Sequence, residues 1–167
     1  MQDFKIQRFN ILPPVVKNIL IINGLLFLAT ITLFVQGINL RDILGLHHWQ
    51  SDSFGTWQII SHMFMHGDFT HLFFNMFAVW MFGAQLENLW GSKRFLKYYI
   101  LTGLGAALLH FIIFHFFELP NTPFQYQKML IERHVVLRAS GCLFGLLVAF
   151  GLLFPNTMLF FLFIPFP

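Results

Sequence analysis

The sequence predicts an all-α membrane protein, built as a bundle of transmembrane helices, because of its composition and the way its charges are spaced. Of the 167 residues, 57% are hydrophobic and 10% are charged, and the mean hydropathy is +0.69. A typical soluble domain has about a quarter of its residues charged. The apolar residues also gather into long uncharged runs, and a helix needs about 20 such residues to cross a bilayer.

Two of these runs lie in the N-terminal half. Residues 18–35 contain no charged side chain, and residues 69–86 contain one titratable group, His71. The first run starts too far from Met1, is too long and lacks a small-residue cleavage site, so it does not fit a signal peptide. We expect both runs to remain in the protein as membrane-spanning helices.

Two more runs follow in the C-terminal half. Residues 98–117 are interrupted only by His110 and His115, and no charged residue occurs in residues 139–167. A Pro-Asn-Thr sequence, typical of a turn, follows Phe154 and divides that last run. We therefore expect a fourth helix that ends near Phe154 and then the start of a fifth helix, which the sequence does not complete.

The positions of the basic residues predict the orientation, because Lys and Arg favour the cytoplasmic side. Three precede the first run and three separate the second from the third: Lys5, Arg8, Lys17, Lys93, Arg94 and Lys97. We expect a cytoplasmic segment over residues 1–14, a membrane domain over residues 15–167, and a bacterial inner membrane as the location, since no transit peptide is present. The net charge of +3 is scattered rather than gathered into a nucleic-acid-binding patch.

This orientation brings three polar residues to a similar depth. If the second helix enters from outside, His71 and Asn75 lie about 3 Å and about 9 Å along it at about 1.5 Å per residue, and Ser140 lies at the outer end of the fourth helix. Polar residues inside a membrane are costly and indicate function. The His71 ring and the Asn75 amide lie on one helix face and are suitable donors for the oxyanion of an acyl-transfer intermediate.

A structural interpretation stands beside this one. Serine and glycine in membrane helices commonly serve close helix packing, and Gly141-x-x-x-Gly145 is itself a pattern of small residues suited to helix contact. The only cysteine, Cys142, has no partner for an intrachain disulfide.

Taken together, two stretches resemble the rhomboid family of intramembrane serine proteases. They read "SHMFMHGDFTHLFFNMFAVWMFGAQLENLWGSKRFLKYYILTGLGAALLH" and "RASGCLFGLLVAFGLLFPN". The resemblance covers roughly residues 15–167. It implies a rhomboid-like bundle with about four complete helices and the start of a fifth, where the family has six.

The resemblance implies a role for each matching residue of the site. Ser140 is the nucleophile and its backbone N–H is part of the oxyanion hole, to which His71 and Asn75 also contribute. Gly141 belongs to the family's Gly-x-Ser-Gly motif. The substrates would be transmembrane segments of membrane proteins within the lipid bilayer, and the family needs no cofactor and no metal.

Other matching positions imply structural roles. His62 and His66 fall on histidines that support loops and water access, and Glu87 falls on a structural glutamate at the cytoplasmic end. Phe144 falls where an aromatic residue packs against the catalytic histidine. The connection over residues 36–68, rich in tryptophan and phenylalanine, is similar to the family's first loop, which lies partly in the membrane interface.

The sequence departs from the family in two places. Rhomboids use a Ser-His dyad whose histidine lies on the sixth helix in a His-x-x-Gly context, and no such helix is present, so we expect the chain to be truncated before it. A serine is a poor nucleophile without a base. The first Gly of the motif is replaced by Arg138, which costs about 1–2 kcal/mol if the backbone there needs a positive φ.

Two alternatives remain open. Arg138 and the absent base are compatible with a non-catalytic rhomboid-like protein that binds transmembrane clients without cleaving them. His62, His66 and His71 could instead hold a zinc ion, because histidines four apart can chelate from one helix face. No carboxylate or cysteine completes such a cluster in the sequence. We expect His110 and His115 to have core or loop roles.

Overall fold

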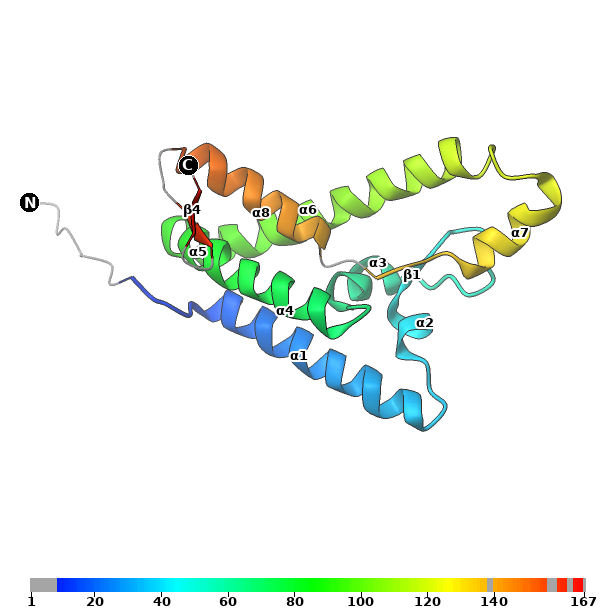
Figure 1. Cartoon of the computed structure of the whole chain (residues 1–167), viewed down its shortest axis with the longest axis horizontal. Helices are drawn as coiled ribbons and strands as arrows, with labels where there is room; N and C mark the ends of the chain where they lie inside the picture. The colour runs from blue at the N-terminus through cyan, green and yellow to red at the C-terminus, as the bar shows by residue number, and fades with distance from the viewer. Residues whose placement is uncertain (1–8, 138–139, 156–158, 162–163, 167) are drawn as a thin grey trace, which may run out of the picture.

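The long helices lie side by side and alternate in direction (Figure 1). The computed structural model describes residues 9–137, 140–155, 159–161 and 164–166. Its main helices are α1 (Pro14–Val35), α4 (Phe69–Ala78), α5 (Ala84–Trp90), α6 (Ser92–Ile113) and α8 (Ser140–Leu153). Helices α1 and α6 run toward the end where the long connections gather, and α4 and α8 run back (Figure 1). The first three apolar runs of the sequence and the first part of the fourth therefore form helices.

Helix boundaries differ from the predicted ones where the amino acids at the ends can start or continue a helix. Helix α1 begins at Pro14 rather than at residue 18, because proline suits a first helical turn, where its missing N–H is not needed. The second run continues past residue 86: the π-helical turn η2 (Val79–Gly83) joins α4 to α5. The third run begins at Ser92 and ends with a second π-helical turn, η3 (Phe114–Glu118).

Within the described residues, two helices are long and apolar enough to cross a membrane, Pro14–Val35 and Ser92–Glu118, and the apolar helix Gly141–Leu153 is shorter. The outward face of α1 is apolar, with Leu25 62% exposed, whereas its buried face includes Asn23. The Asn23 amide donates to the carbonyl of Ile19 at 2.7 Å. An apolar exterior with polar groups turned toward the interior is the arrangement that a bilayer favours.

Short elements that the hydrophobic runs do not predict lie in the connections. The first connection contains α2 (Leu40–Leu44), β1 (Leu46–His47), α3 (Gln58–Ser61) and η1 (His62–Phe64), and the last contains α7 (Phe124–Arg133) and β2 (Val135–Val136). Strands β1 and β2 pair antiparallel, Leu46 with Val136 and His47 with Val135. This pairing joins the first connection to the segment that leads into α8.

The end of the chain differs from the expected start of a fifth helix. Strands β3 (Leu159–Phe161) and β4 (Ile164–Phe166) pair antiparallel there. Pro165 removes a helical hydrogen-bond donor, and aromatic and β-branched residues favour extended backbone. The described part of the chain is thus predominantly helical, with two small strand pairs.

The main core lies where α1, α5, α6 and α8 meet. Its buried side chains include Val16, Ile19, Met63, Leu86, Phe95, Tyr99, Cys142 and Leu146. Helix α8 packs mainly along α6 and also contacts α4, α5 and η2. The core therefore holds α8, the helix that carries the predicted nucleophile, against the helix that carries His71 and Asn75.

Candidate functional site

His71 lies in the first turn of α4, where Asp68 holds both its backbone and its ring. The Asp68 carboxylate accepts a hydrogen bond from the His71 backbone N–H at 2.9 Å and another from the ring Nδ1 at 2.6 Å. The first of these bonds, with the second beside it, lowers the pKa of Asp68. Asp68 is the N-cap of α4, a position at which aspartate is strongly preferred. The sequence analysis did not assign Asp68 to the site, although an Asp just before an apolar run is a recognised N-cap signal.

The bond to Asp68 has a consequence for the chemistry of His71. With Nδ1–H directed at the carboxylate, the neutral ring presents a lone pair at Nε2, and Nε2 becomes a donor only in the protonated ring. The His71 side chain is 75% exposed, so Nε2 is accessible to a reacting group.

Asn75 lies one turn further along the same helix. It is half-buried, and its side chain makes no hydrogen bond within the part of the chain that the structure describes. Because residues four apart share a helix face, His71 and Asn75 are neighbours on α4. The structure thus keeps these two predicted site residues together.

Ser140 is the first residue of α8, and its side chain lies outside the described residues, as does Arg138. The residue after it, Gly141, faces α6 so closely that an added Cβ would overlap the Ala106 side chain. At Gly145, a Cβ would lie less than 3.0 Å from the Thr102 side chain. Both glycines therefore serve close packing of α8 on α6, as the structural interpretation predicted.

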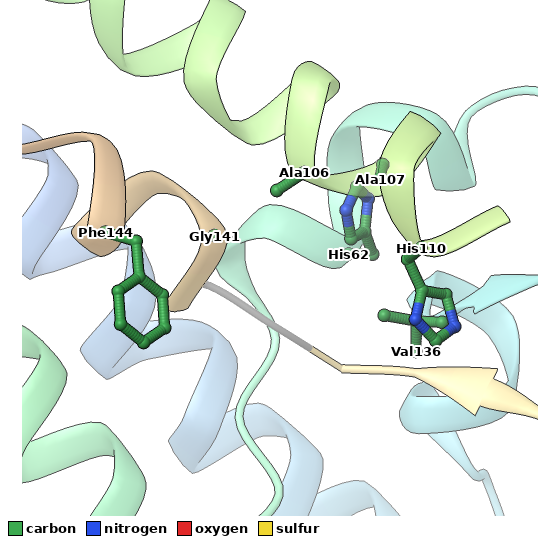
Figure 2. Close-up of a pocket in the computed structure, with 7 residues that line it drawn as sticks. All are labelled: His62, Ala106, Ala107, His110, Val136, Gly141 and Phe144. Carbon is green, nitrogen blue, oxygen red and sulfur yellow. The ribbon is translucent and has the colours of Figure 1, made fainter. Parts of the chain in front are cut away.

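A cavity of about 150 Å³ lies beside the start of α8 (Figure 2). Its lining comes from three parts of the fold, namely η1, α6 and the segment from β2 into α8: His62, Ala106, Ala107, His110, Val136, Gly141 and Phe144. The His62 ring donates from Nδ1 to the carbonyl of Gln58 at 2.8 Å, and burial lowers the pKa of His62. His62 therefore offers a neutral ring to this cavity.

The three histidines of the zinc hypothesis do not converge. His62 is bonded to Gln58, His71 is bonded to Asp68, and His66 is buried in the connection between them. Among the residues the structure describes, no group of three or more His, Cys, Asp or Glu side chains is suited to hold a metal ion.

Phe144 borders the cavity and is 67% exposed.

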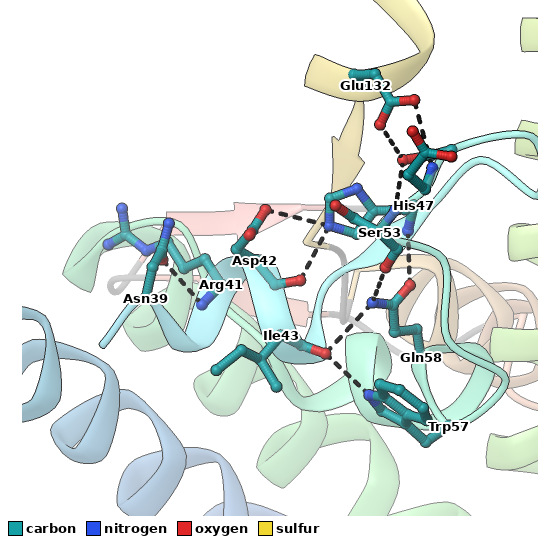
Figure 3. Close-up of polar contacts among 11 residues, drawn as sticks. Asn39, Arg41, Asp42, Ile43, His47, Ser53, Trp57, Gln58 and Glu132 are labelled. Carbon is teal, nitrogen blue, oxygen red and sulfur yellow. Dashed lines mark hydrogen bonds and ion pairs between the residues drawn. The ribbon is translucent and has the colours of Figure 1, made fainter. Parts of the chain in front are cut away.

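A polar network shapes the first connection around the strand pair (Figure 3). The Trp57 indole donates to the carbonyl of Ile43 at 2.9 Å, and the Gln58 amide donates to the carbonyl of Ser53 at 3.0 Å. The His47 backbone N–H donates to the Gln58 side chain at 3.2 Å. These bonds hold β1 in place, and β1 in turn pairs with β2, so the network supports the entry to α8.

A second link joins this connection to α7. The Ser51 hydroxyl donates to Glu132 at 2.6 Å, and the Asp52 backbone N–H donates to the same carboxylate at 3.3 Å. These bonds lower the pKa of Glu132, the Ser51 bond having the largest effect. The residues involved are about 80 positions apart, so sequence patterns contain no signal for the contact.

Comparison with known proteins identifies the family. The Rhomboid domain matches residues 53–167, which is more than half of the chain. The chain is 32% identical over 112 residues to rhomboid protein 1, mitochondrial, from Saccharomyces cerevisiae, covering 65% of this chain and 28% of that protein. No solved structure gives a significant match.

Bacterial relatives match as well. The putative rhomboid protease YdcA of Bacillus subtilis is 29% identical over 155 residues, covering 92% of this chain and 70% of that protein. Rhomboid protease AarA of Providencia stuartii is 29% identical over 93 residues, covering 56% of this chain and 32% of that protein. The chain thus spans less than a third of the yeast and Providencia relatives.

The domain match includes the His62-to-Ser140 motif region, and the fold brings the two motif-bearing helices, α4 and α8, into contact. The helices also have the apolar exteriors of a membrane protein. The chain is an integral membrane protein that belongs to the rhomboid family.

Proposed function

We propose that this chain supplies the nucleophile and oxyanion site of an intramembrane serine protease that cleaves transmembrane segments of membrane proteins. Ser140 attacks the peptide carbonyl, and its proton passes to a general base. The oxyanion accepts hydrogen bonds from the Asn75 amide, His71 and the Ser140 backbone N–H. The tetrahedral intermediate collapses as the base gives this proton to the nitrogen of the breaking C–N bond, and the amine fragment leaves. Water then hydrolyses the acyl-enzyme, which releases the carboxylic acid fragment and restores the Ser140 hydroxyl. No metal or cofactor takes part.

The observation that supports this proposal most directly is the contact between α4 and α8. The helix that Ser140 opens packs against the helix that bears His71 and Asn75. Asp68 contributes by holding the His71 ring through Nδ1, which leaves Nε2 to face the oxyanion and to donate to it when the ring is protonated. The oxyanion donors on α4 and the nucleophile on α8 thereby come from helices whose site residues are about 65 positions apart in the sequence.

The motif residues of this chain do not include a general base for Ser140. No histidine occurs in residues 141–167, and the family pattern requires one in a His-x-x-Gly context. We propose that the base belongs to a further helix of the complete protein. Sequencing the coding DNA beyond codon 167 tests this: an in-frame apolar helix with that histidine supports the protease, whereas a stop codon there favours binding without cleavage.

The competing function is binding of transmembrane clients by a non-catalytic rhomboid-like protein. Arg138, at the motif position that the family fills with glycine, favours this candidate. It predicts that the replacement Ser140→Ala leaves client capture unchanged and that Ser140 does not react with a fluorophosphonate.

Fluorophosphonate labelling of the full reading-frame product in membranes separates the two functions. We expect Ser140 to be labelled and Ser140→Ala to abolish the label. Asn75→Ala should slow labelling by about a hundredfold, the cost of losing one oxyanion donor. Asn121→Ala is the matched control, because Asn121 is exposed and bonds only the Phe117 carbonyl. A label that persists in Ser140→Ala contradicts the assignment.

The location and partners belong to the same proposal. We propose a bacterial inner membrane with a cytoplasmic N-terminus over residues 1–14, and a membrane domain over residues 15–167. The substrates are transmembrane segments of other membrane proteins. Fractionation of the source membranes tests the location, and cleavage of a reporter with a replaceable transmembrane segment tests the substrate class.

A further inference from the structure

Four histidines gather where the first connection, the end of α6 and the segment before α8 meet. His48 follows β1, His134 precedes β2, and His110 and His115 lie on the last turns of α6 and η3. We call these four residues the histidine cluster. None of them belongs to the proposed catalytic group, and their positions in the sequence are up to 86 residues apart, from 48 to 134.

The rings of the cluster are packed around Phe114. The Phe114 ring centroid lies 4.2 Å from that of His134, 5.2 Å from that of His48 and 6.5 Å from that of His110. His48 stacks on His115 with centroids 5.6 Å apart and an angle of 11°. In the antiparallel pair His48 and His134 flank the same end, so the cluster ties this end of the strand pair to α6 and η3 through ring contacts.

One hydrogen bond in the cluster can form only in certain protonation states of its two rings. The Nε2 atoms of His110 and His134 lie 2.8 Å apart. Such a bond needs an N–H on one nitrogen and a lone pair on the other, so it forms when at least one ring is neutral. When both rings are protonated, both nitrogens are donors and the two positive charges repel each other.

Both acidic and basic groups lie on the elements packed against the cluster. From the first connection, Asp42 contacts His47 rather than the cluster. From α7, Glu132 is bound to Ser51 and to the Asp52 backbone. The other charged side chains described on these elements are Arg41 and Asp68, which bond the Gly67 carbonyl and His71, the exposed Asp52, Lys128 and Arg133 on α7, and Glu118, exposed at the end of η3. Asp52, Lys128 and Glu132 line one cavity with His115, so both signs of charge lie beside the cluster. The repulsion depends on the two rings themselves, whose Nε2 atoms are 2.8 Å apart.

The bond lies close to the start of α8. His134 directly precedes β2, and β2 is separated from Ser140 by residues 137–139. His110, Val136 and Gly141 also line the same cavity (Figure 2). A change in how residues 134–136 are held against α6 is therefore transmitted over a short path to the first turn of α8.

We propose that His110 and His134 are positioning residues for Ser140. Their hydrogen bond joins the segment before α8 to α6 and breaks in acid, and we call this bond the fastening. At neutral pH the bond holds β2 and the first turn of α8 in place. In acid, protonation of both rings breaks it and frees this segment. The consequence for catalysis rests on the proposed function of Ser140, whereas the fastening itself does not.

The surroundings of His48 favour its neutral form. Burial, and then the neighbouring His115 and His134, lower the pKa of His48 from 6.5 to about 4. His48 is 1% exposed and borders the same Phe114 ring as His134. Charging the cluster thus places positive groups together inside packed protein, which favours separation of its two sides.

Hydrogen–deuterium exchange of the full-length protein in detergent tests the fastening directly. After correction for the intrinsic rate, we expect exchange in residues 134–146 to be faster at about pH 5 than at about pH 7.5 by at least about fivefold, the effect of two like charges about 4 Å apart even with the screening of bulk water. The control His71→Gln, a histidine on α4, should keep this response. A wild-type protein without the response would overturn the proposal.

Two variants of His134 distinguish a hydrogen bond that depends on protonation from a contact that depends only on packing. Glutamine can donate to a neutral His110 or accept from a protonated one, so His134→Gln should keep residues 134–146 protected at both pH values. His134→Ala should expose them at both. An acid response that survives in His134→Gln would contradict the role of the His110–His134 bond.

Labelling of Ser140 by a fluorophosphonate tests the catalytic consequence. We expect the labelling rate to fall in acid more steeply in the wild-type protein than in His134→Gln. Parallel pH profiles in the two proteins, with Ser140 labelled, would remove the link to positioning. If Ser140 is not labelled at any pH, the proposed function fails, while the exchange experiment still decides whether the fastening exists.

Discussion

Glu87 shows how one side chain fixes the relative position of two helices. Its carboxylate, 2% exposed, accepts hydrogen bonds from the backbone N–H groups of Val15 at 3.0 Å and Val16 at 2.8 Å, and from the Ser92 hydroxyl at 2.6 Å. The first N–H groups of a helix have no partner within the helix and favour a negative charge. Glu87 on α5 therefore completes the first turn of α1 and the start of α6.

We predict that Glu87→Gln destabilises the protein by about 1–3 kcal/mol, because the amide replaces an acceptor with a donor that faces backbone N–H groups. Glu118→Gln is the matched control, since Glu118 is exposed at the end of η3. Unfolding by SDS in mixed micelles would measure both. Equal stability of the two variants would show that the Glu87 contacts are energetically neutral.

The buried histidines predict a pH dependence of stability. Burial lowers the pKa of His62 and His66, and burial together with His115 and His134 lowers that of His48 to about 4. The unfolded chain binds protons at these groups below about pH 6.5, and the folded chain resists them until lower pH. Stability should therefore fall as the pH decreases from about 6.5 toward 4.

We expect His48→Phe, which keeps an aromatic ring beside Phe114, to make this loss shallower. The measurement is the unfolding midpoint in detergent as a function of pH, compared between the variant and the wild-type protein. A wild-type midpoint that rises on acidification would contradict the sign of the effect.

At the scale of elements, the contact between α6 and α8 depends on small residues. Gly145 approaches the rigid Thr102 side chain, and the Tyr98 hydroxyl donates to the Gly145 carbonyl at 2.7 Å. Gly151, further along α8, has open space where a Cβ would lie. The same helix thus offers a packed glycine and an unpacked one.

We predict opposite effects of one substitution at these two positions. Gly145→Ala should destabilise the protein by about 1–3 kcal/mol through overpacking. Gly151→Ala should be neutral or stabilising by up to about 1 kcal/mol, because alanine favours helix. The comparison uses the same SDS unfolding assay. Destabilisation of equal size at both sites would indicate a general intolerance of α8 rather than a specific contact.

For the whole molecule, the alternation of helix directions places the chain connections at two opposite ends (Figure 1). The first connection and α7 lie at one end, and the turn from α5 to α6 lies at the other. This turn carries Lys93 and Arg94, whereas the first connection is rich in aspartate. The charge distribution therefore predicts which end faces the cytoplasm.

Labelling with a membrane-impermeant maleimide tests this orientation in a Cys142→Ala background. We expect Ser53→Cys to be labelled from the outside of intact cells and Lys93→Cys only after the membrane is disrupted. Both positions are exposed in the structure, so access depends on the side of the membrane alone. The reverse pattern would invert the topology.

The sequence alone was sufficient for the number of long apolar runs, their helical character and the resemblance that the family comparison confirms. Uncharged runs are local, and a membrane helix must satisfy its own backbone hydrogen bonds, so length and polarity suffice to predict it. Helix ends were less accurate: Pro14 and Ser92 start helices before the uncharged runs begin. The roles of Ser140, His71 and Asn75 remain predictions.

Contacts between distant residues were decided only by the tertiary structure. The pairing of Leu46 with Val136, the link from Ser51 to Glu132 and the bond between His110 and His134 each join segments that no periodic pattern relates. Asp68 differs, because its N-cap position is local and could have been recognised. Hydrophobicity determines which segments enter the bilayer, but the partner of a polar side chain depends on which surfaces pack together, and that is a property of the folded chain.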